Sequence, residues 1–291
     1  MIRRVSDILK EKSRTYSFEF FPPKTAKTTE RLYETVSELK KLNPDFLTVT
    51  YGAGGSTRET TMMIVDQLQK RFDIPVVHHL TCIGHTKEEL AAMFSKMKGS
   101  GIRNILALRG DPPEGTKEWK STPGGLDYAY QLCEFIKKLH GDYFSIAAAG
   151  FPECHINCPD KRTDSRYLKI KQDAGAEFVI TQLFFDNKCY FEYLERTKAA
   201  GVHLRIIPGI LPITNYQALL KFCATCGANI PQAIHDIFKP LDGNEEATYR
   251  AGVEFAAKQC QELLDGGASG LDFFTLNKVD PVREVLNKIR K

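Results

Sequence analysis

The chain has 291 residues, with 40 lysines and arginines against 36 aspartates and glutamates, so its formal net charge is +4. A 42% hydrophobic and 26% charged composition excludes a collagen-like or disordered chain, and so small a positive excess predicts no nucleic-acid partner. The longest apolar runs have the length of a strand and no apolar leader follows Met1, which predicts no membrane segment and a cytoplasmic protein.

Short runs rich in apolar, β-branched and aromatic residues recur along the whole chain. Nearly continuous apolar runs are typical of parallel strands that helices cover. Eight such runs are predicted strands: 16–21, 46–50, 76–80, 104–108, 145–149, 178–183, 205–210 and 271–275.

The stretches between these runs carry apolar residues at helical spacing. The clearest of them are 29–42, 88–98, 126–139 and 245–264. Eight strand–helix units of roughly 36 residues each predict an α/β fold, a single (β/α)8 TIM barrel over residues 1–291. Residues 227–244 form an irregular insertion with a short helix expected at 231–238. A doubly wound open sheet is the alternative, since alternation alone does not exclude it.

The active site of such a barrel lies at the carboxyl ends of the strands. The first predicted strand carries Glu19 beside Phe18, Phe20 and Phe21. Apolar surroundings raise the pKa of a carboxyl group, as a general acid working near neutral pH requires. We therefore interpret Glu19 as a catalytic acid; the alternative is a buried ion pair.

Other strand ends offer polar groups and flexible backbone. The turn after Tyr51 is rich in glycine, which permits a ligand to approach the backbone closely. Alternation turns one of the adjacent residues His78 and His79 inward. Arg109 lies in a turn where it can meet a phosphate, the alternative being a local pair with Asp111, and Gln182 offers both a donor and an acceptor. No zinc-protease motif, Ser–His–Asp order or metal-ligand spacing stands out, so we predict an organic cofactor and no metal.

The eight cysteines are too few for a disulfide scaffold. Two pairs lie close in sequence, Cys154 with Cys158 and Cys223 with Cys226. The second pair falls in the predicted helix 216–225, where packing is the favoured interpretation, and metal or redox chemistry is the alternative.

With these segments in order, the sequence resembles the methylenetetrahydrofolate reductases, in the short prokaryotic form that has only the catalytic domain. The segments that carry the resemblance are SFEFFPP at 17–23, VTYGA at 49–53, HLTC at 79–82, LRGD at 108–111, DAGA at 173–176, ITQ at 180–182, IPGILP at 207–212 and TLN at 275–277. Their order along nearly the whole chain makes the resemblance specific.

The resemblance implies a barrel that binds FAD noncovalently. NADH or NADPH would reduce the flavin and leave, and methylenetetrahydrofolate would then accept the hydride in a ping-pong cycle. It implies that Glu19 is the general acid that helps to open the imidazolidine ring and that Asp111 is a second catalytic carboxylate near the flavin. We also expect a homo-oligomer.

The family's ligand contacts carry over residue by residue. The flavin contacts implied are Thr50, Tyr51, Ala53, His79, Arg109, Gly110, Asp111, Ala129, Phe151, His155, Asp164, Tyr167 and Lys171. The implied contacts to folate or nicotinamide are Gln182, Phe222 and Lys278. Phe151 stands where some relatives have tyrosine, and Lys278 stands where arginine is common. Two alternatives remain open: a pterin-binding methyltransferase barrel without FAD, and a reductase subunit that a partner protein supplies with electrons.

Overall fold

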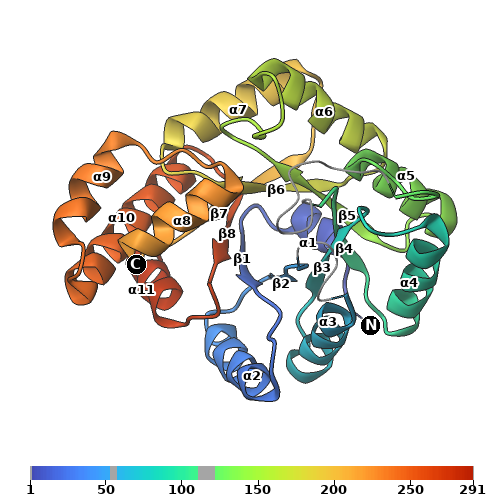
Figure 1. The fold of residues 1–291 in the computed structure, drawn as a ribbon, viewed down its shortest axis with the longest axis horizontal. Coiled ribbons are helices and arrows are strands. Elements are labelled where there is room, and N and C mark those ends of the chain that lie inside the picture. The colour runs from blue at the N-terminus through green and yellow to red at the C-terminus, as the bar shows by residue number, and fades with distance from the viewer. Residues whose placement is uncertain (1, 53–57, 111–121, 291) are drawn as a thin grey trace.

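The structure, a computed structural model, describes residues 2–52, 58–110 and 122–290. Parallel strands join in chain order into a closed barrel (Figure 1). The strands are β1 (Thr15–Phe20), β2 (Phe46–Val49), β3 (Val76–Thr81), β4 (Asn104–Leu108), β5 (Ser145–Gly150), β6 (Phe178–Leu183), β7 (Arg205–Ile210) and β8 (Gly270–Phe274).

All eight predicted strands are present within one residue at each end. The pairing of β8 with β1 decides between the two predicted architectures. It runs in parallel register from Thr15 opposite Gly270 to Glu19 opposite Phe274. An open doubly wound sheet has two edge strands, whereas this pairing closes the ring. The barrel prediction is therefore confirmed.

The helices are α1 (Val5–Glu11), α2 (Ala26–Lys40), α3 (Arg58–Phe72), α4 (Lys87–Gly99), α5 (Ala129–His140), α6 (Lys161–Asp173), α7 (Asn187–Ala199), α8 (Tyr216–Cys226), α9 (Gln232–Phe238), α10 (Glu245–Asp265) and α11 (Asp280–Ile289), with a 3-10 turn, η2 (Lys239–Leu241). Helices surround the barrel and cover its outer face, whereas α1 lies across one end of it (Figure 1). Capping boxes begin α2 at Thr25 and α4 at Thr86. None of the described helices is long and apolar enough to cross a membrane.

Helix α1 closes the amino-terminal end of the barrel and was not predicted from the sequence. The Val5 amide donates to Asn104 Oδ1 at 2.7 Å, and the Ser6 amide donates to Ser145 Oγ at 3.0 Å. Val5 and Leu9 pack with apolar side chains from inside the barrel. A helix of seven residues is too short for a clear helical period, so its position depends on these distant contacts. The carboxyl-terminal end of the barrel, which α1 does not cover, is therefore where we expect the active site.

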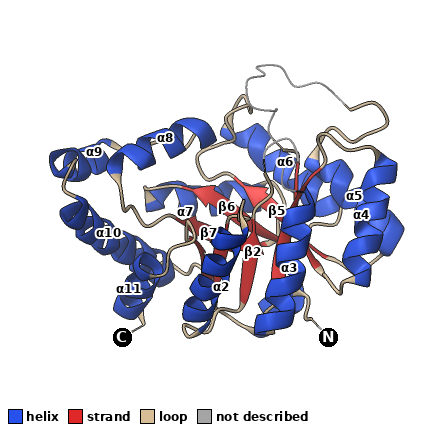
Figure 2. Ribbon diagram, turned by 60° about the horizontal axis from the view of Figure 1, so that its bottom comes forward, coloured by secondary structure: helices blue, strands red, loops and turns tan. Residues whose placement is uncertain are grey.

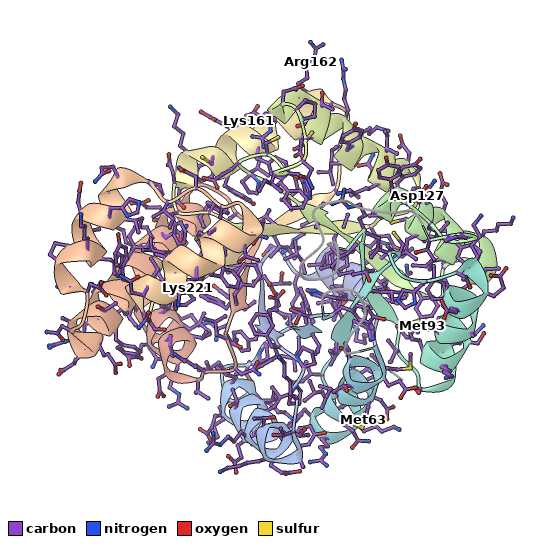
Figure 3. The ribbon with its side chains drawn as sticks, in the orientation of Figure 1. Met63, Met93, Asp127, Lys161, Arg162 and Lys221 are labelled. Carbon is purple, nitrogen blue, oxygen red and sulfur yellow. The ribbon has the colours of Figure 1, made fainter. Side chains whose placement is uncertain are left out.

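The region 227–244 contains α9 and η2, with α9 at the predicted short helix. Figure 2 shows α8 and α9 beyond one end of the strands and both chain ends at the other. A separate apolar cluster, including Leu183, Tyr216, Leu219 and Phe238, packs beneath these two helices. This cluster anchors α8 beside the carboxyl ends of β6 and β8.

Candidate active site

Glu19 and His79 meet inside the barrel, near the carboxyl ends of β1 and β3. Glu19 Oε2 lies 3.6 Å from His79 Nε2, and the two side chains are only 13% and 7% exposed. Alternation places Thr48 on the same inner surface, because it lies opposite Glu19 in the register of β1 and β2. The carboxyl group predicted as a general acid therefore lies in a mostly enclosed pocket of the barrel.

A second carboxyl group, that of Asp272, lies deeper in the barrel than Glu19. Ser17 Oγ donates a hydrogen bond to Asp272 Oδ1 at 2.5 Å, and both residues are fully buried. Burial raises the pKa of Asp272, and the Ser17 hydroxyl lowers it. Within the described part of the chain, the other carboxylate oxygen of Asp272 has no hydrogen-bond partner. Asp272 thus adds a poorly compensated negative charge to this interior.

The pKa of Glu19 is raised well above its ordinary value. Burial is the main cause, the nearby charge of Asp272 adds to it, and the Thr48 hydroxyl opposes it. Burial also lowers the pKa of His79 to about 3, so this imidazole is neutral at physiological pH. A neutral histidine does not form an ion pair with Glu19, so the contact with His79 does not support the ion-pair alternative. Burial and the charge of Asp272 therefore favour the protonated form of Glu19, the form that a general acid needs.

The sequence-based reason for this raised pKa was wrong in one respect. Successive side chains of a strand point to opposite faces, so Phe18 and Phe20 pack in the layer between the barrel and the helices. Phe21 is 37% exposed. The barrel interior and the charge of Asp272, rather than the neighbouring phenylalanines, raise the pKa of Glu19.

Four residues implied as flavin contacts gather at the loop between β5 and α6. The rings of Phe151 and His155 are perpendicular, with their centroids 4.6 Å apart. The His155 amide donates to Asp164 Oδ1 at 3.4 Å. Lys171 Nζ donates to the Ala149 carbonyl at 3.0 Å and lies 5.6 Å from the centre of the Phe151 ring. The structure therefore brings these four side chains together.

The remaining implied flavin contacts lie around the other strand ends. Thr50 and Tyr51 are half-buried after β2, and the Tyr51 ring lies 5.9 Å from that of His78. Gly110 follows β4 with φ +96°, and a Cβ there would come within 2.9 Å of Thr81 Cβ, so glycine is required. Arg109 is half-buried beside it, Ala129 is buried at the start of α5, and Tyr167 is 52% exposed. Ala53 and Asp111 lie outside the described residues.

The three implied substrate contacts come from three different elements. Gln182 is half-buried in β6, and its Oε1 accepts a hydrogen bond from the Leu183 amide at 2.9 Å. Phe222 on α8 packs against the apolar cluster that includes Leu183. Lys278 is exposed after β8, and its Nζ donates to Thr214 Oγ1 at 3.4 Å. The three side chains thus lie near the carboxyl-terminal end of the barrel, each on a different element.

Ser17, Asp272 and Arg196 are candidate site residues that were not predicted from the sequence. A signal for Asp272 exists, because an aspartate interrupts the apolar strand 271–274. Arg196 on α7 donates to the carbonyl groups of Phe151 and Pro152, at 3.0 and 2.6 Å, and so holds the start of the β5–α6 loop. No local sequence pattern marks Arg196, because its partners are more than 40 residues away.

The described residues fit a flavin dinucleotide. On the inner face of β3, His79 Nε2 and Thr81 Oγ1 are buried without a hydrogen-bond partner among them. An unsatisfied buried polar atom costs about 1–3 kcal/mol, so a polar ligand at this end of the barrel would stabilise both. Arg109 and Lys171 supply cationic groups of the kind that bind a pyrophosphate.

Comparison with known sequences identifies a family. A family model described as methylenetetrahydrofolate reductase matches residues 4–290. The 5,10-methylenetetrahydrofolate reductase of Pectobacterium carotovorum subsp. carotovorum is 37% identical over 265 residues, covering 91% of this chain and 86% of the bacterial protein. Methylenetetrahydrofolate reductase (NADH) 1 of Arabidopsis thaliana is 35% identical over 286 residues, 95% of this chain and 48% of the plant protein. The chain thus spans about half the length of the plant and yeast relatives it matches.

Comparison with solved structures agrees on the fold. An uncharacterized protein from Clostridium thermocellum, described as binding two copies of 5-methyl-5,6,7,8-tetrahydrofolic acid, superposes with a TM-score of 0.67. The superposition covers 98% of this chain and 96% of that protein, at 16% sequence identity, and so bears on the fold alone. Because the family model spans almost the whole chain and the bacterial relatives are covered over most of their length, this chain belongs to the methylenetetrahydrofolate reductase family.

Proposed function

We propose that this protein reduces 5,10-methylenetetrahydrofolate to 5-methyltetrahydrofolate with NADH or NADPH as the donor. The observation that carries the proposal is the enclosed carboxyl group of Glu19. Burial and the charge of Asp272 both raise the pKa of this group. FAD, when bound, would accept a hydride from the nicotinamide and later pass it to the folate in a ping-pong cycle. Family membership supports this reaction.

Glu19 is the proposed general acid. It would donate its proton to a nitrogen of the five-membered ring of the substrate, opening that ring to an iminium carbon that accepts hydride. Asp111 is proposed as the second carboxylate near the reacting rings. Gln182, Phe222 and Lys278 would orient the folate at the mouth of the barrel.

The implied flavin contacts would hold the cofactor around the carboxyl ends of β2 to β5. In our proposal Arg109 and Lys171 bind the pyrophosphate, and Phe151, His155 and Asp164 bind the part of the cofactor near the β5–α6 loop. Residues 1–291 act as a single catalytic domain in this proposal, with 227–244 as its insertion. We also propose a cytoplasmic location, because all eight cysteines are free thiols, as is usual in a reducing compartment. The homo-oligomer stays a prediction of the resemblance.

The cofactor provides the first test. Purified protein is expected to be yellow and to release FAD on denaturation, and either NADH or NADPH should bleach it in the absence of air. A colourless protein that FAD does not reconstitute would contradict the proposal and favour the methyltransferase barrel. A yellow protein that neither nicotinamide bleaches would instead indicate a protein electron donor.

The effect of Asp272 on the pKa of Glu19 predicts how the pH dependence of folate reduction should change in a variant. Asp272→Asn keeps an oxygen that can accept the Ser17 hydroxyl hydrogen bond and removes the negative charge that raises the pKa of Glu19. The pKa of Glu19 should therefore fall, and the loss of its proton should occur at lower pH. We expect the alkaline limb of the kcat profile for folate reduction to move to lower pH, with no such shift in flavin reduction by NAD(P)H. An unchanged alkaline limb would remove Asp272 from this role.

A further inference from the structure

Two cysteines meet Asp164, itself one of the predicted flavin contacts, in a group that we call the thiol–carboxylate cluster: Cys154, Cys158 and Asp164. The two Sγ atoms and a carboxylate oxygen of Asp164 lie within 4.8 Å of one another. Across residues 2–52, 58–110 and 122–290, this is the one group of at least three such side chains that comes so close. Linear spacing predicts no metal site in this chain, because these three side chains come together only in the fold.

The backbone of the β5–α6 loop holds the three side chains in place. Cys154 has a φ of +94°, an unusual value for a residue with a side chain. Its Sγ faces the carbonyl oxygens of His155 at 3.7 Å and Cys158 at 3.8 Å, and Cys158 Sγ faces the Asp160 carbonyl at 3.4 Å. A thiol is a weak donor, so none of these contacts competes strongly with a metal ion.

Asp164 completes the cluster from the first turns of α6. The residue is only 6% exposed, and its Oδ1 accepts the His155 amide. Cys154 and Cys158 are free thiols and only half-buried, so the cluster can be reached from solvent. All three ligand atoms come from an eleven-residue stretch, 154–164, so little loop-closure entropy opposes their meeting.

The surrounding charges allow a divalent cation to bind. The charge of Arg196 acts on both Cys154 and Asp164, and that of Lys171 acts on Asp164. These two cations would repel a metal ion added to neutral thiols. A divalent ion that displaces the two thiol protons leaves the total charge of the cluster unchanged, because two positive charges replace two. The cluster therefore suits an ion that binds thiolate.

The chemistry of the ligands selects the kind of ion. Thiolates bind zinc and other soft divalent ions, whereas magnesium and calcium prefer oxygen ligands. We propose that Cys154 Sγ, Cys158 Sγ and a carboxylate oxygen of Asp164 bind one Zn²⁺-class ion, with the fourth position of the tetrahedron left to water. Two S–H bonds release their protons to solvent as two metal–sulfur bonds form, with no change of oxidation state. The site shares Asp164 with the proposed flavin contacts, but metal binding itself does not require the proposed reductase activity.

The first test uses the reduced, chelator-treated full-length protein, with whatever flavin it retains. Calorimetric titration with Zn²⁺ alone, repeated in buffers of different ionisation enthalpy, should give one ion per chain and release of about two protons. X-ray absorption at the zinc edge should give two sulfur neighbours at about 2.3 Å and oxygen neighbours at about 2.0–2.2 Å. Because these measurements use the unaltered chain, they do not depend on whether a variant folds.

Matched double variants locate the ion. Cys154→Ser with Cys158→Ser should abolish stoichiometric binding, and Cys223→Ser with Cys226→Ser, which removes the other closely spaced pair, should leave it intact. No stoichiometric binding by the reduced wild-type protein would overturn the proposal. So would a zinc shell without two sulfurs, or equal loss of binding in the two double variants. Flavin bleaching by NAD(P)H, measured on the same samples, tests the proposed function separately.

Discussion

Glu19→Gln is expected to reduce the rate of methylenetetrahydrofolate reduction by about 10²–10⁴-fold, the usual contribution of a general acid. Glutamine has nearly the same shape but no acidic proton, so ring opening loses its donor while the pocket keeps its form. Reduction of the flavin by NADH or NADPH needs no proton from this group and should keep its rate. Stopped-flow absorbance measures the two half-reactions separately in the absence of air.

Glu153 provides a matched control. Burial also raises the pKa of this carboxyl group, but Glu153 lies in the β5–α6 loop, where its Oε2 accepts the Asn229 amide at 2.8 Å. Glu153→Gln keeps an acceptor for that hydrogen bond and should leave both half-reactions unchanged. If Glu19→Gln slowed flavin reduction as much as folate reduction, its role as the acid of the folate step would be wrong.

Gly252→Ala is expected to destabilise the fold by roughly 1–3 kcal/mol or more, the range seen when a packed interior is overfilled. Gly252 lies in α10, where a Cβ would come within 1.6 Å of the Ile213 carbonyl oxygen and 2.7 Å of its carbonyl carbon. The obstacle is backbone in the segment between β7 and α8, so no side-chain rotation relieves the overlap. Urea unfolding followed by circular dichroism should give a lower midpoint with a similar slope.

Gly99→Ala is the matched comparison, because Gly99 is also helical and a Cβ there has nothing within 4 Å. Removing a glycine from a helix can stabilise the protein by up to about 1 kcal/mol. The two substitutions add the same methyl group and should change the free energy of unfolding in opposite directions. Destabilisation by Gly99→Ala, or none by Gly252→Ala, would contradict this account of how α10 packs.

The strands could be predicted from sequence because a parallel strand under helices is a nearly continuous apolar run. Phe46 to Val49 and Ile105 to Leu108 are such runs, and each belongs to a strand that was predicted within one residue. Helix α1 was not predicted because it is short and its apolar residues pack only against the inside of the barrel. Local periodicity indicates which residues face a core, but it does not identify the elements against which they pack.

Candidate site residues divide in the same way. Glu19 could be singled out because a carboxyl group in an apolar strand is unusual. The surroundings of Glu19 could not be predicted. Phe18 and Phe20 point away from the barrel interior, and Asp272, 253 residues further along the chain, lies near Glu19 inside it. Cys154, Cys158 and Asp164 are close in sequence, yet their convergence depends on the positive φ of Cys154 and the start of α6.

The sequence by itself thus determined the eight strands, their alternation with helices and the candidate acid, since each follows from local pattern and motif, and it left the barrel and the open doubly wound sheet as alternatives. Only the tertiary structure decided that β8 closes against β1, that Ser17 bonds Asp272 across 255 residues, and that two thiols meet a carboxylate. The physical reason is that closing the barrel brings together residues that lie far apart in the sequence. Burial and charge act through space, and the pKa of Glu19 is set by the carboxyl group that the closed barrel places near it.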